Sequence, residues 1–269
     1  LGFGYNRDLT LPSAENIGSH PLIQPIMNPT IPPKFDDMNK DFLPDEGAFW
    51  GAVGLRIETF QMISTFALLA LKFGRQFEVD ILGISDMEFP VQEAGDPEPP
   101  LARIKIGVVA RMVPERGVLS VQGAFLPGSY IYLPQAHISG GFAMLTIAKD
   151  QNDGEWNGEK AGDFIFTLGG YASSYQPKAF YPRVSRLALT WQVSSALSVK
   201  AQQYFAITPE AMMVGGHVMA NFQEGGSLSI HVYFVMGADL IIYWKPYHYL
   251  GHIYAELNVA ANISVDCWL

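Results

Sequence analysis

The sequence predicts an all-β, mainly antiparallel protein, and three observations predict it. Several runs alternate apolar and polar residues with a period of two, as half-buried strands do. The connections between these runs are short, which suits hairpins because parallel crossovers need a dozen or more residues. The 269 residues include 26 Gly and 18 Pro, and only 16% are charged, which favours sheets and tight turns over surface helices. We expect about eleven long strands in one large meander that forms a barrel, a sandwich or an extended groove.

Residues 1–47 are predicted to form a Pro-rich N-terminal arm, because prolines remove the donors that a central strand needs. Four apolar side chains in it indicate that the arm packs on the body. We expect it to lie across the body or a neighbouring copy and to cap an edge or an apolar face. The remaining residues, 48–269, are predicted to be a single antiparallel β domain. The prolines are Pro25, Pro29, Pro32, Pro33 and Pro44, and the apolar residues are Leu22, Ile23, Ile26 and Phe35.

Alternation is clearest in the second half of the chain, where residues 186–265 are predicted to form a continuous antiparallel meander. The segment 57–73 fits either a buried helix or strands. Strands are favoured because the neighbouring segment 76–81 alternates. Seven apolar residues share parity within their strands and are predicted to be mostly buried: Leu187, Leu189, Trp191, Val193, Ile230, Val232 and Phe234.

The formal net charge of −9 disfavours nucleic acid and anionic membrane surfaces as partners, since both require basic patches. No stretch reaches the ~18 uninterrupted apolar residues of a membrane helix. Cys267 is the only cysteine, so an internal disulfide is excluded. The sequon at Asn262 is compatible with an extracellular location but does not fix the compartment.

Two segments resemble metal sites but do not match their patterns. His248 and His252 have the spacing of a helical zinc pair, yet their surroundings favour a strand, on which they would lie about 13 Å apart. The acidic loop that begins at Asp150 lacks the Gly and Glu of an EF-hand at the required positions, Glu155 and Ala161 standing there instead. Irregular calcium coordination by this loop stays open as an alternative. The sequence therefore indicates no metal and no cofactor.

No catalytic motif is recognisable, and we predict no catalytic residues. Glycine pairs do not form a phosphate-binding loop, and no G-x-S-x-G elbow is present. The pairs are predicted to mark bulges, bends or places where another backbone comes close. They occupy positions 140–141, 169–170, 215–216 and 225–226.

The densest group of aromatic and polar residues lies at 243–254, and it could line a stacking surface for a sugar or another flat ligand. The alternative is a strand–turn–strand corner with core aromatics. The candidate ligand-binding residues are His231, Asp239, Trp244, Lys245, Tyr247, His248, Tyr249 and His252.

Several motifs together resemble the DUF6603 family, a family of unknown function found in large bacterial and fungal proteins. They are Gly169-Gly-Tyr, Tyr181-Pro-Arg-Val-Ser-Arg-Leu, Ala238-Asp-Leu-Ile-Ile-Tyr-Trp-Lys-Pro-Tyr-His-Tyr and the opening Gly2-Phe-Gly-Tyr-Asn. The resemblance extends in order to about residue 265, with Ala172 where the family usually has His. It implies that the chain is part of a longer polypeptide, and it transfers no site residues.

Three functions remain as hypotheses. The first is a non-catalytic β-scaffold for assembly or binding, whose partners are further copies of itself or other parts of a larger polypeptide. The second is a secreted carbohydrate-active enzyme or sugar-binding module that uses the cluster at 243–254. The third is a β-groove that holds lipid or another apolar ligand. The wetted face of residues 231–254 would discriminate among them.

Overall fold

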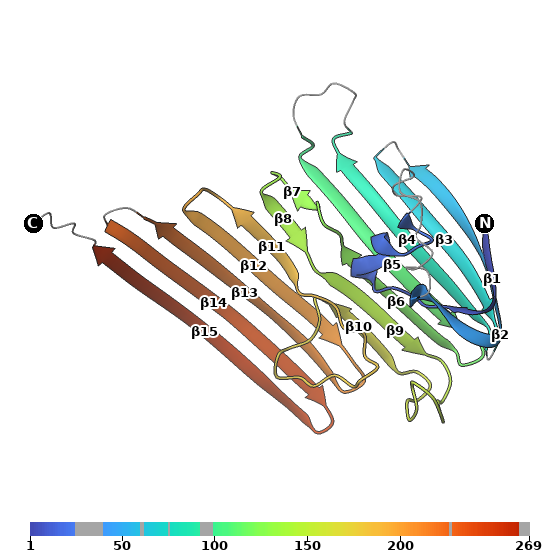
Figure 1. Cartoon of the computed structure of the whole chain (residues 1–269). Coiled ribbons are helices and arrows are strands. Elements are labelled where there is room, and N and C mark those ends of the chain that lie inside the picture. The colour runs from blue at the N-terminus through green and yellow to red at the C-terminus, as the bar shows by residue number, and fades with distance from the viewer. Residues whose placement is uncertain (25–39, 60–61, 75, 92–98, 226–227, 264–269) are drawn as a thin grey trace, which may run out of the picture.

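The computed structural model describes residues 1–24, 40–59, 62–74, 76–91, 99–225 and 228–263. These residues form one antiparallel sheet of 15 strands (Figure 1), so the predicted all-β, antiparallel class is confirmed. The described strands outnumber the predicted eleven because several are too short to alternate visibly. The elements are β1 (Gly2–Leu9), the 3₁₀ helix η1 (Ala14–Ser19), β2 (Phe42–Thr59), β3 (Ile63–Phe73), β4 (Glu78–Phe89), β5 (Ala102–Val113), β6 (Val118–Phe125), β7 (Tyr130–Ile131), β8 (Ala136–Ser139), β9 (Gly141–Ile147), β10 (Phe164–Leu168), β11 (Leu187–Gln192), β12 (Leu197–Ile207), β13 (Ala211–Glu224), β14 (Leu228–Trp244) and β15 (Tyr247–Ile263).

The strands follow chain order from β1 to β6, after which the order is β9, β10, β12, β13, β14 and β15. β10 pairs with one half of β12, and β11 pairs with the other half. Beyond β11, β8 pairs with β11, β7 pairs with β8, and β7 also pairs with β5. β11 to β15 pair antiparallel in chain order, as expected for the meander over residues 186–265, up to residue 263.

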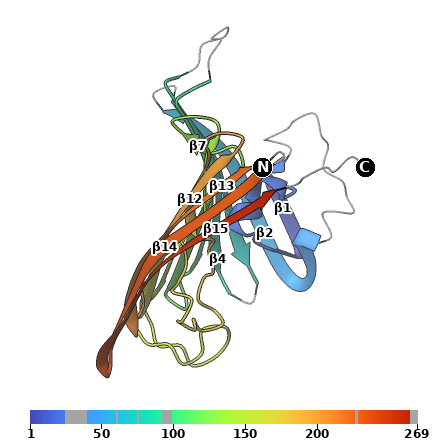
Figure 2. The same cartoon turned by 90° about the vertical axis from the view of Figure 1, so that its left-hand side faces the viewer.

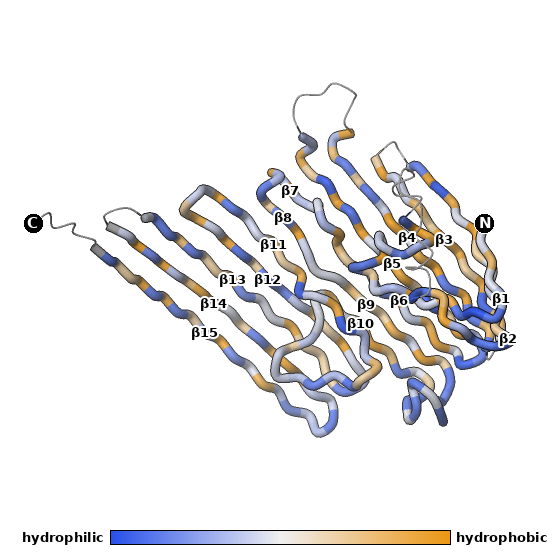
Figure 3. The backbone as a smooth tube through the Cα atoms, viewed as in Figure 1, coloured by the Kyte–Doolittle hydropathy of each residue, from blue (hydrophilic) through white to orange (hydrophobic). Residues whose placement is uncertain are grey.

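The sheet has two faces with different neighbours. One, which we call the covered face, carries the N-terminal segment with η1 and the loops at 148–163 and 169–186; Figure 2 shows these segments on one side of the sheet. We call the opposite one the bare face. Apolar and polar residues alternate along most strands (Figure 3), and because successive side chains point to opposite faces, the register assigns each residue to one of them.

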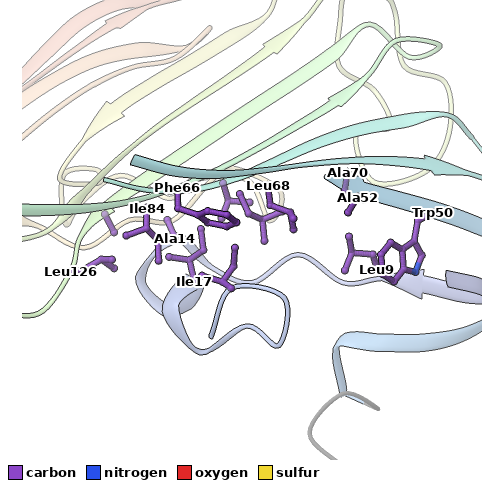
Figure 4. Close-up of a cluster of buried hydrophobic side chains, with 14 of the residues drawn as sticks. Leu9, Ala14, Ile17, Trp50, Ala52, Phe66, Leu68, Ala70, Ile84 and Leu126 are labelled. Atoms are coloured by element: carbon purple, nitrogen blue, oxygen red, sulfur yellow. The ribbon is translucent and has the colours of Figure 1, made fainter. Parts of the chain in front are cut away.

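The first core cluster lies under the N-terminal segment. Ala14 and Ile17 of η1 approach Phe66, Ile84 and neighbouring side chains of the sheet (Figure 4). Ile17 and the nearby Leu9 are both 0% exposed. The short helix has no side-chain cap, so its stability comes from this packing rather than from its own hydrogen bonds.

The second core cluster lies under the loops at 148–163 and 169–186. Trp156, Tyr171, Tyr175 and Tyr181 from these loops pack on apolar residues of β5, β6, β9, β10 and β12 to β14. The Tyr171 hydroxyl donates to the Pro182 carbonyl at 3.0 Å, and the Tyr175 hydroxyl donates to Glu210 at 3.0 Å. The hydroxyls of Tyr171 and Tyr175 are thereby satisfied, as burial favours, whereas the buried Tyr181 hydroxyl has no hydrogen-bond partner in the described part of the chain.

Two of the four glycine pairs sit where another backbone comes close, as predicted. Gly140 has φ +110°, and a Cβ built there would lie 2.2 Å from the carbonyl oxygen of Arg186. Gly169 has φ +71°, and its Cβ would lie 2.5 Å from the carbonyl oxygen of Gln203. Both positions therefore exclude any side chain.

The N-terminal residues contribute more regular structure than an arm. Residues 2–9 form β1, which pairs with β2, and β2 itself begins at Phe42. Leu22 and Ile23 pack on the first core cluster, whereas the predicted contacts of Ile26 and Phe35 lie outside the described residues. The division of the chain at residue 47 stays a prediction.

One prediction about the core was wrong in part: six of the seven residues are partly buried but lie outside both core clusters, and Val193 is exposed. The seven residues expected to be mostly buried share a face where they lie in strands β11 and β14, but it is the bare face. Leu187, Leu189 and Trp191 are only partly buried there, and Val193, just after β11, is 42% exposed. Alternation identified the residues that point the same way but not which face this chain covers.

Candidate functional site

The bare face is the most unusual surface of the molecule. From Phe49 in β2 to Val259 in β15, the side chains that the register assigns to it form continuous apolar rows across neighbouring strands. One row runs through Val214, Leu240 and Gly251 in β13 to β15.

Between Phe49 in β2 and Val259 in β15, the only charged residue that the described register places on this face is Glu224, at the end of β13. Many large apolar residues on it are well exposed. They are Phe49, Val53, Leu55, Ile57, Leu69, Leu71, Phe73, Ile81, Met112, Val214, Val218, Met236, Trp244, Tyr247, Tyr249, Ile253, Leu257 and Val259. Monomeric soluble proteins rarely expose contiguous apolar patches of more than a few hundred Å², so this face has the character of an interaction surface.

A shallow hollow of about 740 Å³ lies on the bare face between β13 and β15. Gly216, Ala238 and Gly251 form its floor, since none of them extends beyond a methyl group. Ile253, which is 85% exposed, stands beside it. A large apolar side chain or part of an acyl chain would fit such a hollow.

The eight candidate ligand-binding residues do not share one surface. Trp244, Tyr247 and Tyr249 are assigned to the bare face, and Lys245 lies at the turn between β14 and β15. The others, His231, Asp239, His248 and His252, are assigned to the opposite face. A ligand that stacks on the bare-face rings would not reach these polar side chains, and the binding role of the group stays a prediction.

Asp239 belongs instead to a polar network on the covered side of β12 to β15. The Tyr204 hydroxyl donates to Asp239 Oδ1 at 2.6 Å, and His217 Nε2 lies 3.4 Å from the same oxygen. His217 also bonds to the Tyr254 hydroxyl. The Arg186 guanidinium lies 3.9 Å from the centre of the Tyr204 ring. Burial raises the pKa of Tyr204, and its bond to Asp239 raises it further, so the phenol stays protonated and acts as a donor.

Glycine makes room for this network. A Cβ at position 215 would lie 2.3 Å from Asp239 Oδ1, and one at position 237 would lie 2.6 Å from His217 Nδ1. The Gly215–Gly216 pair was a signal of this close approach, but the neighbours of Gly215 are the side chains of Asp239 and Tyr204 rather than another backbone.

A second polar group, missed by the sequence reasoning, lies on the covered face of β3 to β5. Lys72 Nζ lies 2.8 Å from Asp8 and 3.2 Å from Glu78, and Arg111 Nη2 lies 2.9 Å from Glu78. Burial would raise the pKa of Glu78, but hydrogen bonds from Arg111 and Gln76 outweigh it and lower that pKa to about 2. Glu78 is therefore a carboxylate at any physiological pH.

Asp80 is the exception in this polar group. It is 0% exposed, and neither carboxyl oxygen has a hydrogen-bond partner in the described part of the chain. Burial raises the pKa of Asp80 to about 7, although the charge of Lys72 opposes the shift. A cleft of about 370 Å³ next to this group is lined by Lys72, Glu78 and Arg111 among others.

The acidic loop after β9 uses its carboxylates in ion pairs and backbone contacts. Asp153 pairs with Arg116 at 2.7 Å, and Glu159 pairs with Lys178 at 2.7 Å. Asp150 accepts a hydrogen bond from the Ala161 amide at 2.9 Å. Among the described residues, no cluster of three or more His, Cys, Asp or Glu side chains is arranged to hold a metal ion.

A family model described as a family of unknown function, DUF6603, matches residues 1–269. The chain belongs to the DUF6603 family. Comparisons with curated proteins and with solved structures found no match. Within the described ranges, this DUF6603 chain has no helix of the length and apolarity that a membrane span requires.

Proposed function

We propose that this DUF6603 chain is a non-catalytic β-scaffold that assembles with an apolar partner through its bare face. The observation that carries the proposal is the near absence of charge among the described residues of that face, combined with the exposure of its large apolar residues.

Energetics support this proposal. Burial of apolar surface contributes about 25 cal/mol per Å², or about 1.5–3 kcal/mol for a fully buried large side chain. Ile253, Leu257 and Val259 alone are 85%, 65% and 64% exposed. Covering such residues across many strands would supply a large driving force for assembly.

A lipid-holding surface is the second candidate, and the hollow over Gly216, Ala238 and Gly251 favours it. Acyl chains need only apolar contact, which the bare face supplies. The carbohydrate alternative has less support, because sugars need stacking rings and polar groups on one surface, and here these groups are assigned to opposite faces.

A matched pair of leucines on the edge strand β15 tests the proposal. Leu257 is 65% exposed and lies on the bare face, whereas Leu250 is 54% exposed and lies on the other face. We expect Leu257→Asp to change either the mass in solution or the emission of the neutral apolar dye Nile red, while Leu250→Asp changes neither. Circular dichroism establishes that both variants are folded. A folded wild-type monomer that binds no Nile red, with both variants indistinguishable from it, would refute the proposal.

A further inference from the structure

The extent of the bare face limits what can cover it. The strands that follow one another across the sheet are β1 to β6, β9, β10 and β12 to β15. At about 4.8 Å per strand, they span roughly 50 Å. A typical strand of the sheet such as β3 or β12 has 11 residues, or roughly 36 Å at about 3.3 Å per residue. The face therefore has an area on the order of 1,800 Å².

That area suits a permanent protein interface. Two such faces in contact would bury roughly 3,600 Å² in total, within the range of about 2,000–5,000 Å² that obligate dimers bury. The near absence of charge also fits, because the buried centres of homodimer interfaces are depleted in charged residues.

The shape of the face favours a second sheet over a small ligand. Binding sites for small ligands bury most of the ligand inside a cleft, but here exposure remains high out to the edge strand, with Val214 at 42% and Ile253 at 85%. An acyl chain lying on this face would keep its outer side in water. A facing sheet at about 10 Å would exclude water from both surfaces.

The alternation of hollows and projecting side chains on the bare face also fits sheet-on-sheet packing. A methyl group added at Gly51, Gly83 or Gly216 would come no closer than 3.6 Å to any described atom beyond its own neighbours in the chain, so these glycines leave open hollows. Phe49, Leu55 and Ile253 project between such hollows and are 42%, 55% and 85% exposed. Small and large side chains on facing sheets interdigitate in β-sandwiches.

The geometry points to a second copy of this chain as the occupant: two copies pack bare face to bare face around a two-fold axis and form a β-sandwich. A two-fold axis brings the same patch of both copies together, and a surface with so little charge meets its own copy without repulsion. This inference rests on the proposed function, because it names the partner that the bare face binds.

Solution mass tests the inference directly. The chain has a mass of 29.7 kDa, so the sandwich predicts 2 × 29.7 = 59.4 kDa by light scattering. Val218 is 39% exposed near the middle of β13, and Val218→Asp would place one unpaired carboxylate from each copy in the apolar interface. We expect a rise in the dimer dissociation constant of about 100-fold or more, and a similar effect from Leu257→Asp at the edge. The control Leu250→Asp keeps the wild-type mass.

Three outcomes overturn the inference. A dimer that survives both Val218→Asp and Leu257→Asp uses another surface, such as the open edge of β15. A wild-type monomer that binds Nile red or extracts lipid from neutral phosphatidylcholine vesicles keeps the proposed function but has an apolar partner of another kind. A wild-type monomer that binds neither overturns the inference and the proposed function together.

Discussion

Asp80 provides a sharp test of the covered face, because its ionisation is opposed by burial. The folded pKa of Asp80 is raised to about 7 from its ordinary value of 3.8. Between these values the folded state holds a proton that the unfolded state has lost. The contribution of the protonated group to stability is therefore fully present below pH 3.8 and is lost as the pH rises through 7. Asp80→Asn removes this titration while it preserves the shape of the side chain.

The size of the effect follows from the shift. Each pKa unit corresponds to about 1.4 kcal/mol, so a shift of about three units costs the wild type at most about 4 kcal/mol above pH 7. At pH 5 only part of that cost has developed, because the folded carboxyl is still protonated while the unfolded one is ionised. The stability of Asp80→Asn relative to wild type is expected to rise by about 2–3 kcal/mol between pH 5 and pH 8. Taking the difference between two pH values cancels any constant cost of burying the amide.

Urea unfolding at pH 5 and pH 8, at one protein concentration, measures this difference. Glu115→Gln, at an exposed position in the turn between β5 and β6, is the control and should give the same stability change at both values. If Asp80→Asn shifts the unfolding midpoint equally at pH 5 and pH 8, Asp80 is not a buried carboxyl that titrates near neutrality.

Two further substitutions test local geometry. Gly140→Ala should lower the free energy of unfolding by about 2–5 kcal/mol, because it combines a strained φ with a collision against a backbone carbonyl. Gly47 has φ +82° but open space where a Cβ would lie, so Gly47→Ala should cost only about 1–2 kcal/mol. Equal melting temperatures for the two variants would contradict this account. Tyr204→Phe should cost about 1–3 kcal/mol by thermal denaturation, since it removes the donor to Asp239. Tyr233→Phe should change stability much less, because the Tyr233 hydroxyl makes no hydrogen bond within the described part of the chain.

The sequence predicted the fold class well because period-two alternation is a local property of each strand. The pairs of β11 to β15 follow from short turns between alternating runs, such as the turn at 208–211 between β12 and β13. The short strands β7 and β8 could not be predicted in this way. They have 2 and 4 residues, which is too few for a period to be recognised, and their pairing with β5 and β11 depends on the tertiary structure.

Alternation alone could not assign the faces. In β4 the pattern Glu78-Val79-Asp80-Ile81 suggests apolar residues inside and carboxylates outside, but Asp80 is buried and Ile81 is 42% exposed. The reversal depends on Lys72 and Arg111 in the neighbouring strands, which supply positive charge to Glu78. Residues from three strands create this environment, so no single segment of the sequence contains the signal.

The contrast between the two faces is itself a physical argument for a covering layer. On the covered face, Lys72, Glu78 and Arg111 are tolerated because they pair with one another. A face that stays in water could carry charged residues without cost, since solvated side chains of either sign are stable there. A face that becomes buried loses several kcal/mol for each unpaired charge. The bare face carries apolar residues at nearly every described position and one charged residue, Glu224, at its margin. This is the composition of a buried layer. Trp191 was predicted to be a core residue from its alternation with polar neighbours, and the same alternation places its side chain on the bare face.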